Sequence, residues 1–189
     1  MAEFFDTISE KHAAFIAAQP VFFVATAAVG ARINLSPKGM DCFRVLDDRR
    51  VAYLDVAGSG NETHAHLAAD GRITVMFCAF DRAALILRLY GHGRAILPQD
   101  ARWAEMAAPF TLLPGTRQIF EIAVDQVQTS CGWGVPFMTF ERERQTLRKA
   151  HAQIDDARRL EIFAGRTTSI DGLSVRVPTA IPAAAAMES

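Results

Sequence analysis

Cysteine is scarce in this sequence, which contains only three: Cys42, Cys78 and Cys131. They are odd in number, lie far apart and form no Cys-x-x-Cys pair. That spacing argues against a disulfide framework and against a zinc site. Because free cysteines suit a reducing compartment, we expect a cytoplasmic protein.

A dominant charge is missing too. The formal net charge is -1 at pH 7, and the arginines are scattered instead of forming a basic stripe with interleaved aromatic residues. No electrostatic argument therefore favours a nucleic acid or an anionic membrane as a partner.

A membrane-length apolar segment is also lacking. Residues 13–31 carry no charge, but Pro20 interrupts them and Gly30 ends them, whereas a transmembrane helix needs about 20 predominantly apolar residues. Acidic Glu3 and Glu10 near the start do not fit a secretory signal, which begins with a basic leader. We therefore expect no membrane span and no targeting segment.

Sequence motifs for dinucleotide binding, metal binding or catalysis by side chains alone are absent as well. Gly58 and Gly60 follow a strand but lack the third glycine of a dinucleotide-binding motif. His64 and His66 would lie on different faces of a helix, so they make a poor metal pair and we expect no metal site. No Ser/His/Asp or Cys/His signature is present. In an enzyme of this kind, a bound cofactor has to carry the chemistry.

What the sequence does have is apolar bulk. Half of its residues, 50%, are hydrophobic, which is enough to fill the core of one domain. We expect a single domain over residues 1–176, followed by a Pro/Ala-rich tail, 177–189, that frays.

The periodicity of the apolar residues predicts many short strands and few helices. We expect helices at residues 3–18, 61–69 and 98–108, and an amphipathic helical region at 141–163. We expect strands at residues 21–27, 32–36, 43–46, 51–56, 73–80, 85–90 and 120–127, with a break at Pro37 and a bend or bulge near Gly91. This pattern favours a mainly β fold, a small antiparallel barrel with helical decoration.

Two small polar loops lie beside these strands. The first offers the hydroxyl of Ser36 and the cation of Lys38. The second, residues 59–63, opens a helix, and its Ser59 and Glu62 match a capping box. Free N–H groups at a helix start also suit a phosphate. The alternatives are an exposed turn lysine and a simple helix cap.

The order of these segments resembles a known family. A strand at residues 21–27 is followed by the Ser-Pro-Lys-Gly loop, a Val-Ala-Tyr-Leu-Asp strand, the Gly-Ser-Gly-Asn-Glu-Thr turn, and the strands Arg-Ile-Thr-Val-Met-Phe and Leu-Arg-Leu-Tyr-Gly. Over residues 15–136 this order resembles the pyridoxamine 5′-phosphate oxidase-like family, and within it a bacterial subgroup distinct from the vitamin B6 enzyme. The resemblance implies a six-stranded split β-barrel of the FMN-binding type, a homodimer, and one FMN at each end of the dimer interface.

Two departures from the family pattern bear on the activity. The oxidase has an Arg-Lys pair that grips the flavin phosphate, and Glu62 and Thr63 stand at the matching positions here. The oxidase also ends in a segment with a tryptophan and substrate-binding basic residues, which residues 169–173 echo without a preceding tryptophan. We therefore do not expect pyridoxamine phosphate to be the substrate.

The resemblance turns the two loops into a candidate flavin site. Lys38 could replace the missing basic pair, because charge-assisted hydrogen bonds are about twice as strong as neutral ones. Arg88 lies on an otherwise apolar strand and needs a partner, either the flavin, an acid across the dimer or a structural ion pair. Trp133 could cover the flavin of the other subunit or pack in the core. The cofactor-binding candidates are Ser36, Lys38, Tyr53, Asp55, Ser59, Asn61, Glu62, Thr63, Arg88 and Trp133.

Three functions fit these observations. The first is an FMN-dependent oxidoreductase with an unidentified small-molecule substrate or electron donor. The second is a carrier, sensor or store that binds flavin or haem without turnover, with His92 or His64 as the haem ligand. The third uses a deazaflavin, whose longer acidic tail would favour a more basic groove than this sequence offers.

Overall fold

The computed structural model describes residues 2–184. Its strands are β1 (Glu3–Phe5), β2 (Phe22–Thr26), β3 (Asn34–Lys38), β4 (Phe43–Val45), β5 (Arg50–Val56), β6 (Arg72–Cys78), β7 (Leu85–Ile96) and β8 (Thr116–Cys131). Its helices are α1 (Glu10–Ala17), α2 (Glu62–Ala69), α3 (Trp103–Ala107), α4 (Thr146–Ala152) and α5 (Asp156–Ala164). The strands form one antiparallel sheet in the order β3-β2-β6-β7-β8-β5-β4, with β1 also paired to β8.

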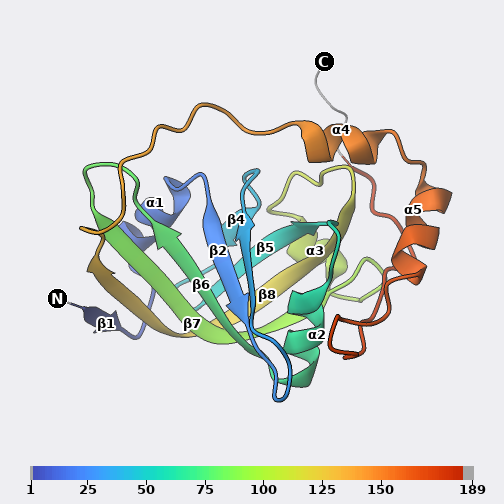
Figure 1. Ribbon diagram of the computed structural model, residues 1–189, viewed down its shortest axis with the longest axis horizontal. Coiled ribbons are helices and arrows are strands. Elements are labelled where there is room, and N and C mark those ends of the chain that lie inside the picture. The colour runs from blue at the N-terminus through green and yellow to red at the C-terminus, as the bar shows by residue number, and fades with distance from the viewer. Residues whose placement is uncertain (1, 185–189) are drawn as a thin grey trace.

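Two long strands curl this sheet into a half-barrel (Figure 1). β7 has 12 residues and β8 has 16, and β8 pairs with β7 on one edge and with β5 and β1 on the other. The β7–β8 register shifts between Tyr90 and Gly91, and a Cβ at Gly91 would collide with the backbone of Ala123. A bulge with a glycine at a close backbone approach bends a strand, so the predicted bulge is confirmed.

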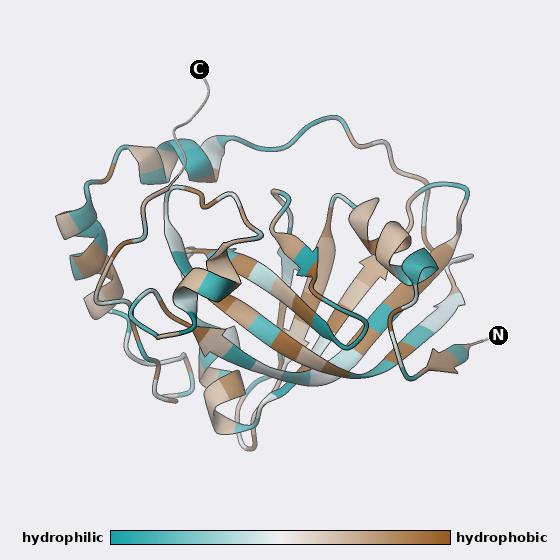
Figure 2. Cartoon of the chain, turned by 180° about the vertical axis from the view of Figure 1, so that it is seen from behind, coloured by the Kyte–Doolittle hydropathy of each residue, from teal (hydrophilic) through white to brown (hydrophobic). Residues whose placement is uncertain are grey.

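The core fills the inside of the curl. Hydrophobic and hydrophilic residues alternate along the strands (Figure 2), as a half-buried sheet requires. Val24, Val75, Leu87 and Leu89 are fully buried. Residues 73–80 were expected to form a central strand, and β6 indeed lies between β2 and β7.

The mainly β, split-barrel prediction is confirmed. Six strands have five or more residues, which is the expected number, and the three-residue strands β1 and β4 extend the sheet. No helix within residues 2–184 is long and apolar enough to cross a membrane.

The predicted helix at residues 3–18 is wrong in its first half. Residues 3–5 form β1, which pairs with β8, and α1 begins only after Ser9. The Ser9 hydroxyl accepts a hydrogen bond from the His12 backbone N–H at 3.2 Å, so it caps the helix. Phe4 and Phe5 are compatible with a strand as well as with a helix, so their pairing with β8 decides which structure they adopt.

Pro37 does not break its strand, contrary to prediction. It lies inside β3, paired with Phe23. β3 is an edge strand that pairs only with β2, and an edge strand tolerates the missing N–H of proline.

The remaining differences concern element lengths. The helix expected at residues 98–108 is limited to α3, because Leu97 and Asp100 form a turn before it. The helical region expected at 141–163 starts at 146 and is divided by Asp155, which caps α5. The last strand runs from 116 to 131 instead of 120 to 127. Part of the predicted tail, residues 185–189, lies outside the described residues.

Candidate functional site

A cavity of about 850 Å³, lined by apolar as well as polar side chains and here called the polar cavity, lies between the barrel and the part of the chain that follows it. Most of the predicted site residues line this polar cavity, namely Ser36, Lys38, Asp55, Ser59, Asn61, Glu62 and Thr63. The fold thus gathers residues that are up to 27 positions apart in the sequence. This grouping makes the polar cavity the candidate binding site.

β3 supplies one wall of the polar cavity. Asn34, Ser36 and Lys38 line it and are half-buried, whereas Leu35 is exposed and Pro37 touches the cavity only from an exposed position. Successive side chains of a strand point to opposite faces, so the alternation along β3 presents a row of polar groups to the cavity.

A buried ion pair forms the floor. Arg117 donates through Nε and Nη2 to Asp55 Oδ2 at 2.9 and 2.8 Å, and through Nη1 to the Gly60 carbonyl at 2.9 Å. The β5–β8 register jumps from Asp55 opposite Gln118 to Val56 opposite Thr116. Arg117 is therefore the extra residue of a β-bulge, which re-aims a side chain. The bulge brings both Arg117 and Gln118 to the same carboxylate.

Asp55 is held as a carboxylate. Burial raises the pKa of Asp55, but the nearby charges of Arg117 and Lys38 and the hydrogen bond from Gln118 lower it more, so the net pKa shift is downward. Lys38 Nζ lies 3.7 Å from Asp55 Oδ1, which is beyond hydrogen-bond distance. Its ammonium group therefore keeps donors for another partner.

A chain of hydrogen bonds runs from this floor to the C-terminal part of the chain. Gln118 Nε2 donates to Asp55 Oδ2 and to Asn61 Oδ1, and Gln118 Oε1 lies 2.7 Å from His64 Nδ1. The Arg176 backbone N–H donates to His64 Nε2 at 3.2 Å. Because Nε2 accepts, the His64 proton is on Nδ1 and the ring is neutral. Burial lowers the pKa of His64 in agreement with this state.

The N-terminus of α2 opens on the polar cavity without a side-chain cap. The predicted capping box is wrong: Asn61 is the N-cap residue and makes no side-chain cap bond. Its Oδ1 accepts from Gln118 instead, and the Glu62 carboxylate accepts from the Ile170 backbone N–H at 3.1 Å. Both groups that could cap the helix are thus engaged elsewhere, and its first N–H groups keep the partial positive charge that attracts anions.

The roof of the polar cavity comes from residues 132–176, here called the roof segment. It crosses over the open side of the barrel towards α4 and α5 (Figure 1). Glu143 accepts from the Met40 backbone N–H at 3.2 Å, and His151 Nε2 lies 2.7 Å from the Ala57 carbonyl oxygen. The Asp171 carboxylate accepts from the Arg32 backbone N–H at 2.8 Å and pairs with its guanidinium group. These separate contacts hold the roof segment over one side of the cavity, which stays partly open to solvent.

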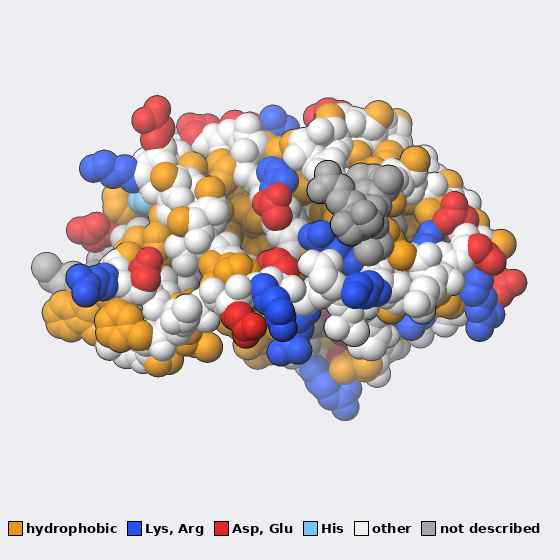
Figure 3. Space-filling model, turned by 90° about the horizontal axis from the view of Figure 1, so that it is seen from above, with side chains coloured by type: hydrophobic (Ala, Val, Ile, Leu, Met, Phe, Trp, Pro, Cys, Tyr) orange, Lys and Arg blue, Asp and Glu red, His pale blue; other side chains and the backbone are white. Residues whose placement is uncertain are grey.

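The lining of the polar cavity is close to neutral, with a slight cationic excess. Its cations are Lys38, Arg117, Arg142 and Arg144, and its carboxylates are those of Asp55, Glu62 and Glu143. Seen from above, charges of both signs are spread over the surface and form no single patch (Figure 3). Any anion would therefore be bound by local donors and not by a broad positive field.

Three predicted site residues lie away from the polar cavity. Tyr53 is fully buried and packs against Phe120 at a ring distance of 4.9 Å. Arg88 lies on β7 and donates to Ser130 Oγ at 3.2 Å. Trp133 is 86% exposed at the start of the roof segment, so it is not the core tryptophan of the alternative interpretation.

Sequence reasoning missed Arg117, Gln118 and the contribution of the roof segment. The short stretch from Thr116 to Gln118 follows a Pro-Gly turn, and a strand starting there would have placed both side chains beside β5. The bulge that turns them to one carboxylate has no local sequence signal.

The two histidines considered as haem ligands lie in different surroundings. Both ring nitrogens of His64 are engaged, and His92 is exposed with Nδ1 2.8 Å from Asp125. Among residues 2–184 no group of three or more His, Cys, Asp or Glu side chains could hold a metal ion.

The curled antiparallel sheet with its cavity at one side defines a split-barrel protein. The fold is shared with HupZ of Group A Streptococcus, at a TM-score of 0.51 and 21% identity, covering 64% of this chain and 91% of that one. It is also shared with a protein from Lactobacillus delbrueckii described as a putative pyridoxamine 5′-phosphate oxidase, at a TM-score of 0.53 and 14% identity, covering 65% and 94%. At these identities the likeness concerns the fold alone.

Sequence comparison identifies the family. The family described as pyridoxamine 5′-phosphate oxidase matches residues 8–131. The chain is also 39% identical over 151 residues to the pyridoxamine 5′-phosphate oxidase family protein ustO of Aspergillus flavus, across 77% of this chain and 61% of that protein. The chain thus spans about three fifths of that relative. It belongs to the pyridoxamine 5′-phosphate oxidase family.

Proposed function

We propose that this protein binds FMN in the polar cavity and works as an oxidoreductase on a small molecule. The observation that carries the proposal is the uncapped N-terminus of α2, which lines the same cavity as Lys38 and Ser36. The cavity volume of about 850 Å³ lies within the ~300–1,000 Å³ typical of cofactor sites. Family membership supports the same choice.

The donors of the polar cavity fit the phosphate of such a cofactor. The first N–H groups of α2, at Glu62 and Thr63, suit a phosphate because they carry no side-chain cap. The Lys38 ammonium, free of a close hydrogen bond to Asp55, supplies the cation that replaces the family's Arg-Lys pair. The Glu62 carboxylate also lines the cavity, but it is turned towards the Ile170 N–H and does not occupy the helix cap.

The residues that line the cavity would bind the cofactor, orient it and cover part of it. The Arg117–Asp55 pair fixes the Gly60 turn that leads into α2, so the phosphate donors are held in place before the ligand arrives. The roof segment covers part of the cavity through Phe140, Glu143 and Leu147 and leaves the rest open to solvent. A bound flavin would supply the redox chemistry.

We also propose that the protein is a homodimer. The Arg88 guanidinium has no carboxylate within ion-pair distance among residues 2–184 and donates only to Ser130. It lies on the outer face of the sheet, where Phe23 and Met76 are half-buried. A second copy covering this face would give Arg88 an acidic partner and would bury Trp133. Sedimentation equilibrium tests this, and a monomer at micromolar concentration would contradict it.

The test of FMN binding starts from an absorbance spectrum of the purified protein, before and after FMN is added and the excess is removed. Retained flavin bands support the proposal, and a colourless protein that retains no FMN would overturn it. Lys38→Ala is expected to weaken FMN binding at least tenfold, which corresponds to ~1.4 kcal/mol. Lys149→Ala is the matched control, because Lys149 is exposed and does not line the polar cavity.

Turnover separates the oxidoreductase from the alternative of a flavin carrier, sensor or store. The oxidoreductase should have its flavin reduced by NADH or NADPH, or by another donor, at a catalytic rate. A carrier should bind FMN with the same dependence on Lys38 and show no such reduction.

A further inference from the structure

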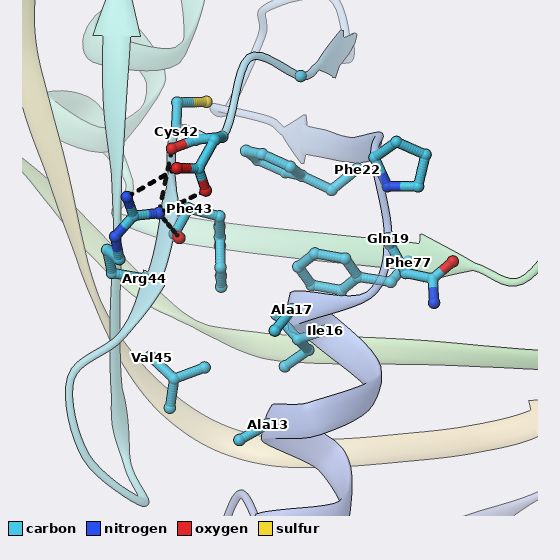
Figure 4. Close-up of a pocket in the computed structure, with 13 residues that line it drawn as sticks. Ala13, Ile16, Ala17, Gln19, Phe22, Cys42, Phe43, Arg44, Val45 and Phe77 are labelled. Carbon is cyan, nitrogen blue, oxygen red and sulfur yellow. Dashed lines mark hydrogen bonds and ion pairs between the residues drawn. The ribbon is translucent and has the colours of Figure 1, made fainter. Parts of the chain in front are cut away.

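A second pocket, here called the aromatic pocket, lies between α1 and the barrel. Its volume is about 320 Å³, and α1, β2, β4 and β6 all contribute to it. Ala13, Ile16 and Ala17 of α1 line one side, opposite Phe43 and Val45 (Figure 4). Nothing in the proposed FMN site uses this space, so its chemistry can be considered independently.

Three phenyl rings surround the aromatic pocket. The ring of Phe43 meets Phe22 and Phe77 at centroid distances of 5.0 Å each, with interplanar angles of 65° and 79°. Phe22 and Phe77 are 5.6 Å apart (Figure 4). Phe22 and Phe77 are buried in this cluster, whereas Phe43 is partly exposed and presents an aromatic surface to the pocket, to which a guest ring could stack or pack edge-to-face.

The charged groups at the aromatic pocket are neutralised inside the chain. The Arg44 guanidinium donates to both oxygens of Asp41 at 2.8 and 3.0 Å, and its Nε donates to the Pro109 carbonyl. Burial raises the pKa of the Cys42 thiol to about 12, so this thiol is neutral at physiological pH. A charged guest would therefore lose its hydration without gaining a free counter-charge.

The wall between the aromatic pocket and the polar cavity is conformationally strained. Met40 and Asp41 have φ values of 65° and 52° without being glycines, a conformation that is unfavourable for residues with a Cβ. Gly39 and Cys42, on either side of them, line both spaces. Two contacts hold the backbone of this wall in its unfavourable conformation: the Arg44–Asp41 ion pair and the hydrogen bond from the Met40 N–H to Glu143.

From this geometry we propose that the aromatic pocket binds a small uncharged aromatic molecule, at a site separate from the polar cavity. An apolar protein cavity of ~150 Å³ holds benzene, so the larger aromatic pocket suits one or two fused rings. The partly exposed ring of Phe43 and the side chains of Ile16 and Val45 provide the contact surface, and the paired charge of Arg44 excludes anions as guests. This site does not depend on whether the protein binds FMN.

The first test uses 5-fluoroindole as the probe, followed by fluorine NMR during titration of the full chain. Saturable binding is expected, and indole-3-acetate should bind at least tenfold more weakly. Ala13→Leu fills the aromatic pocket and should weaken 5-fluoroindole binding at least fivefold. Ala14→Leu adds the same side chain to an exposed position of α1 that does not line the pocket, and it should bind like the wild type.

Saturating FMN should leave the affinity for 5-fluoroindole within twofold. Displacement by FMN, an unchanged affinity in Ala13→Leu, or no binding by the wild type would each overturn the proposal. Crystals soaked with 5-bromoindole keep the test decisive even if Ala13→Leu does not fold. An anomalous bromine peak beside Phe43 and Phe77 is expected, and a peak elsewhere or none would refute the site.

Discussion

The polar cavity has two sides that are built in opposite ways. On the barrel side, Asp55 and Arg117 are buried. Asp55 on β5 accepts hydrogen bonds from both Arg117 and Gln118 on the neighbouring strand β8. On the roof side, Glu143 and His151 each reach the barrel through a single hydrogen bond to a backbone atom. A buried, multiply bonded pair is costly to break, whereas single contacts at a surface contribute little. The barrel therefore fixes the binding geometry, and the roof can adjust.

Replacing the buried cation should show the largest difference between the two sides. Arg117→Met leaves the Asp55 carboxylate buried without its main partner, which typically costs about 3–5 kcal/mol. Arg142→Met, on the roof side, removes a cation that is 82% exposed and should stay within about 0.5 kcal/mol of the wild type. Urea unfolding measures both. Equal losses would mean that the two sides are equally rigid.

Substitutions at two glycines, Gly115 and Gly30, test how firmly the roof segment is held against the barrel. Gly115 has a φ of +86°, and a Cβ there would collide with the His151 ring of α4. Gly115→Ala should cost about 1–3 kcal/mol from backbone strain and also loosen α4. Gly30→Ala, at a φ of +76° with nothing near its Cβ, should show only the strain. Limited proteolysis within residues 132–176 should accelerate in Gly115→Ala alone; the same acceleration in Gly30→Ala would contradict the seating role of His151.

Low pH should destabilise the folded protein through His64, which links the barrel to the roof segment. The pKa of His64 is lowered by burial, from a usual value of 6.5, so the unfolded chain takes up this proton before the folded one does. The free energy of unfolding should then fall as the pH drops below about 6.5 towards the lower folded pKa of His64. Thermal unfolding of the wild type and of His64→Gln across this range isolates the contribution. Identical pH profiles would exclude it.

The smallest effect is expected at the roof contact of Glu143. Glu143→Gln keeps an oxygen that can accept from the Met40 N–H and removes only the charge, so stability should change by less than about 1 kcal/mol. Chemical unfolding of Glu143→Gln and Arg117→Met side by side gives the free energies of unfolding for the smallest and the largest expected effect. A loss above 2 kcal/mol would place Glu143 with the buried framework instead.

The sequence could predict the barrel and its bulge near Gly91 better than the bulge at Arg117 and the roof segment. The strands at 51–56, 73–80 and 85–90 are recognisable because their apolar residues alternate or are buried on both faces. Ser36 and Asp55 lie on strands that were predicted, whereas Lys38 was expected in a loop and instead continues β3. The position of Arg117 could not be predicted, because its direction results from the register shift opposite Asp55. Nor does the amphipathic pattern of residues 141–163 say which surface those helices would cover.

The roof segment begins one residue beyond the part of the chain that matches the family, residues 8–131. It is contiguous in sequence and joins the barrel covalently at a single point, the end of β8. The cover of the cavity and the barrel beneath it are therefore separable in the covalent structure: a change anywhere in residues 132–176 leaves every pairing of the sheet in place.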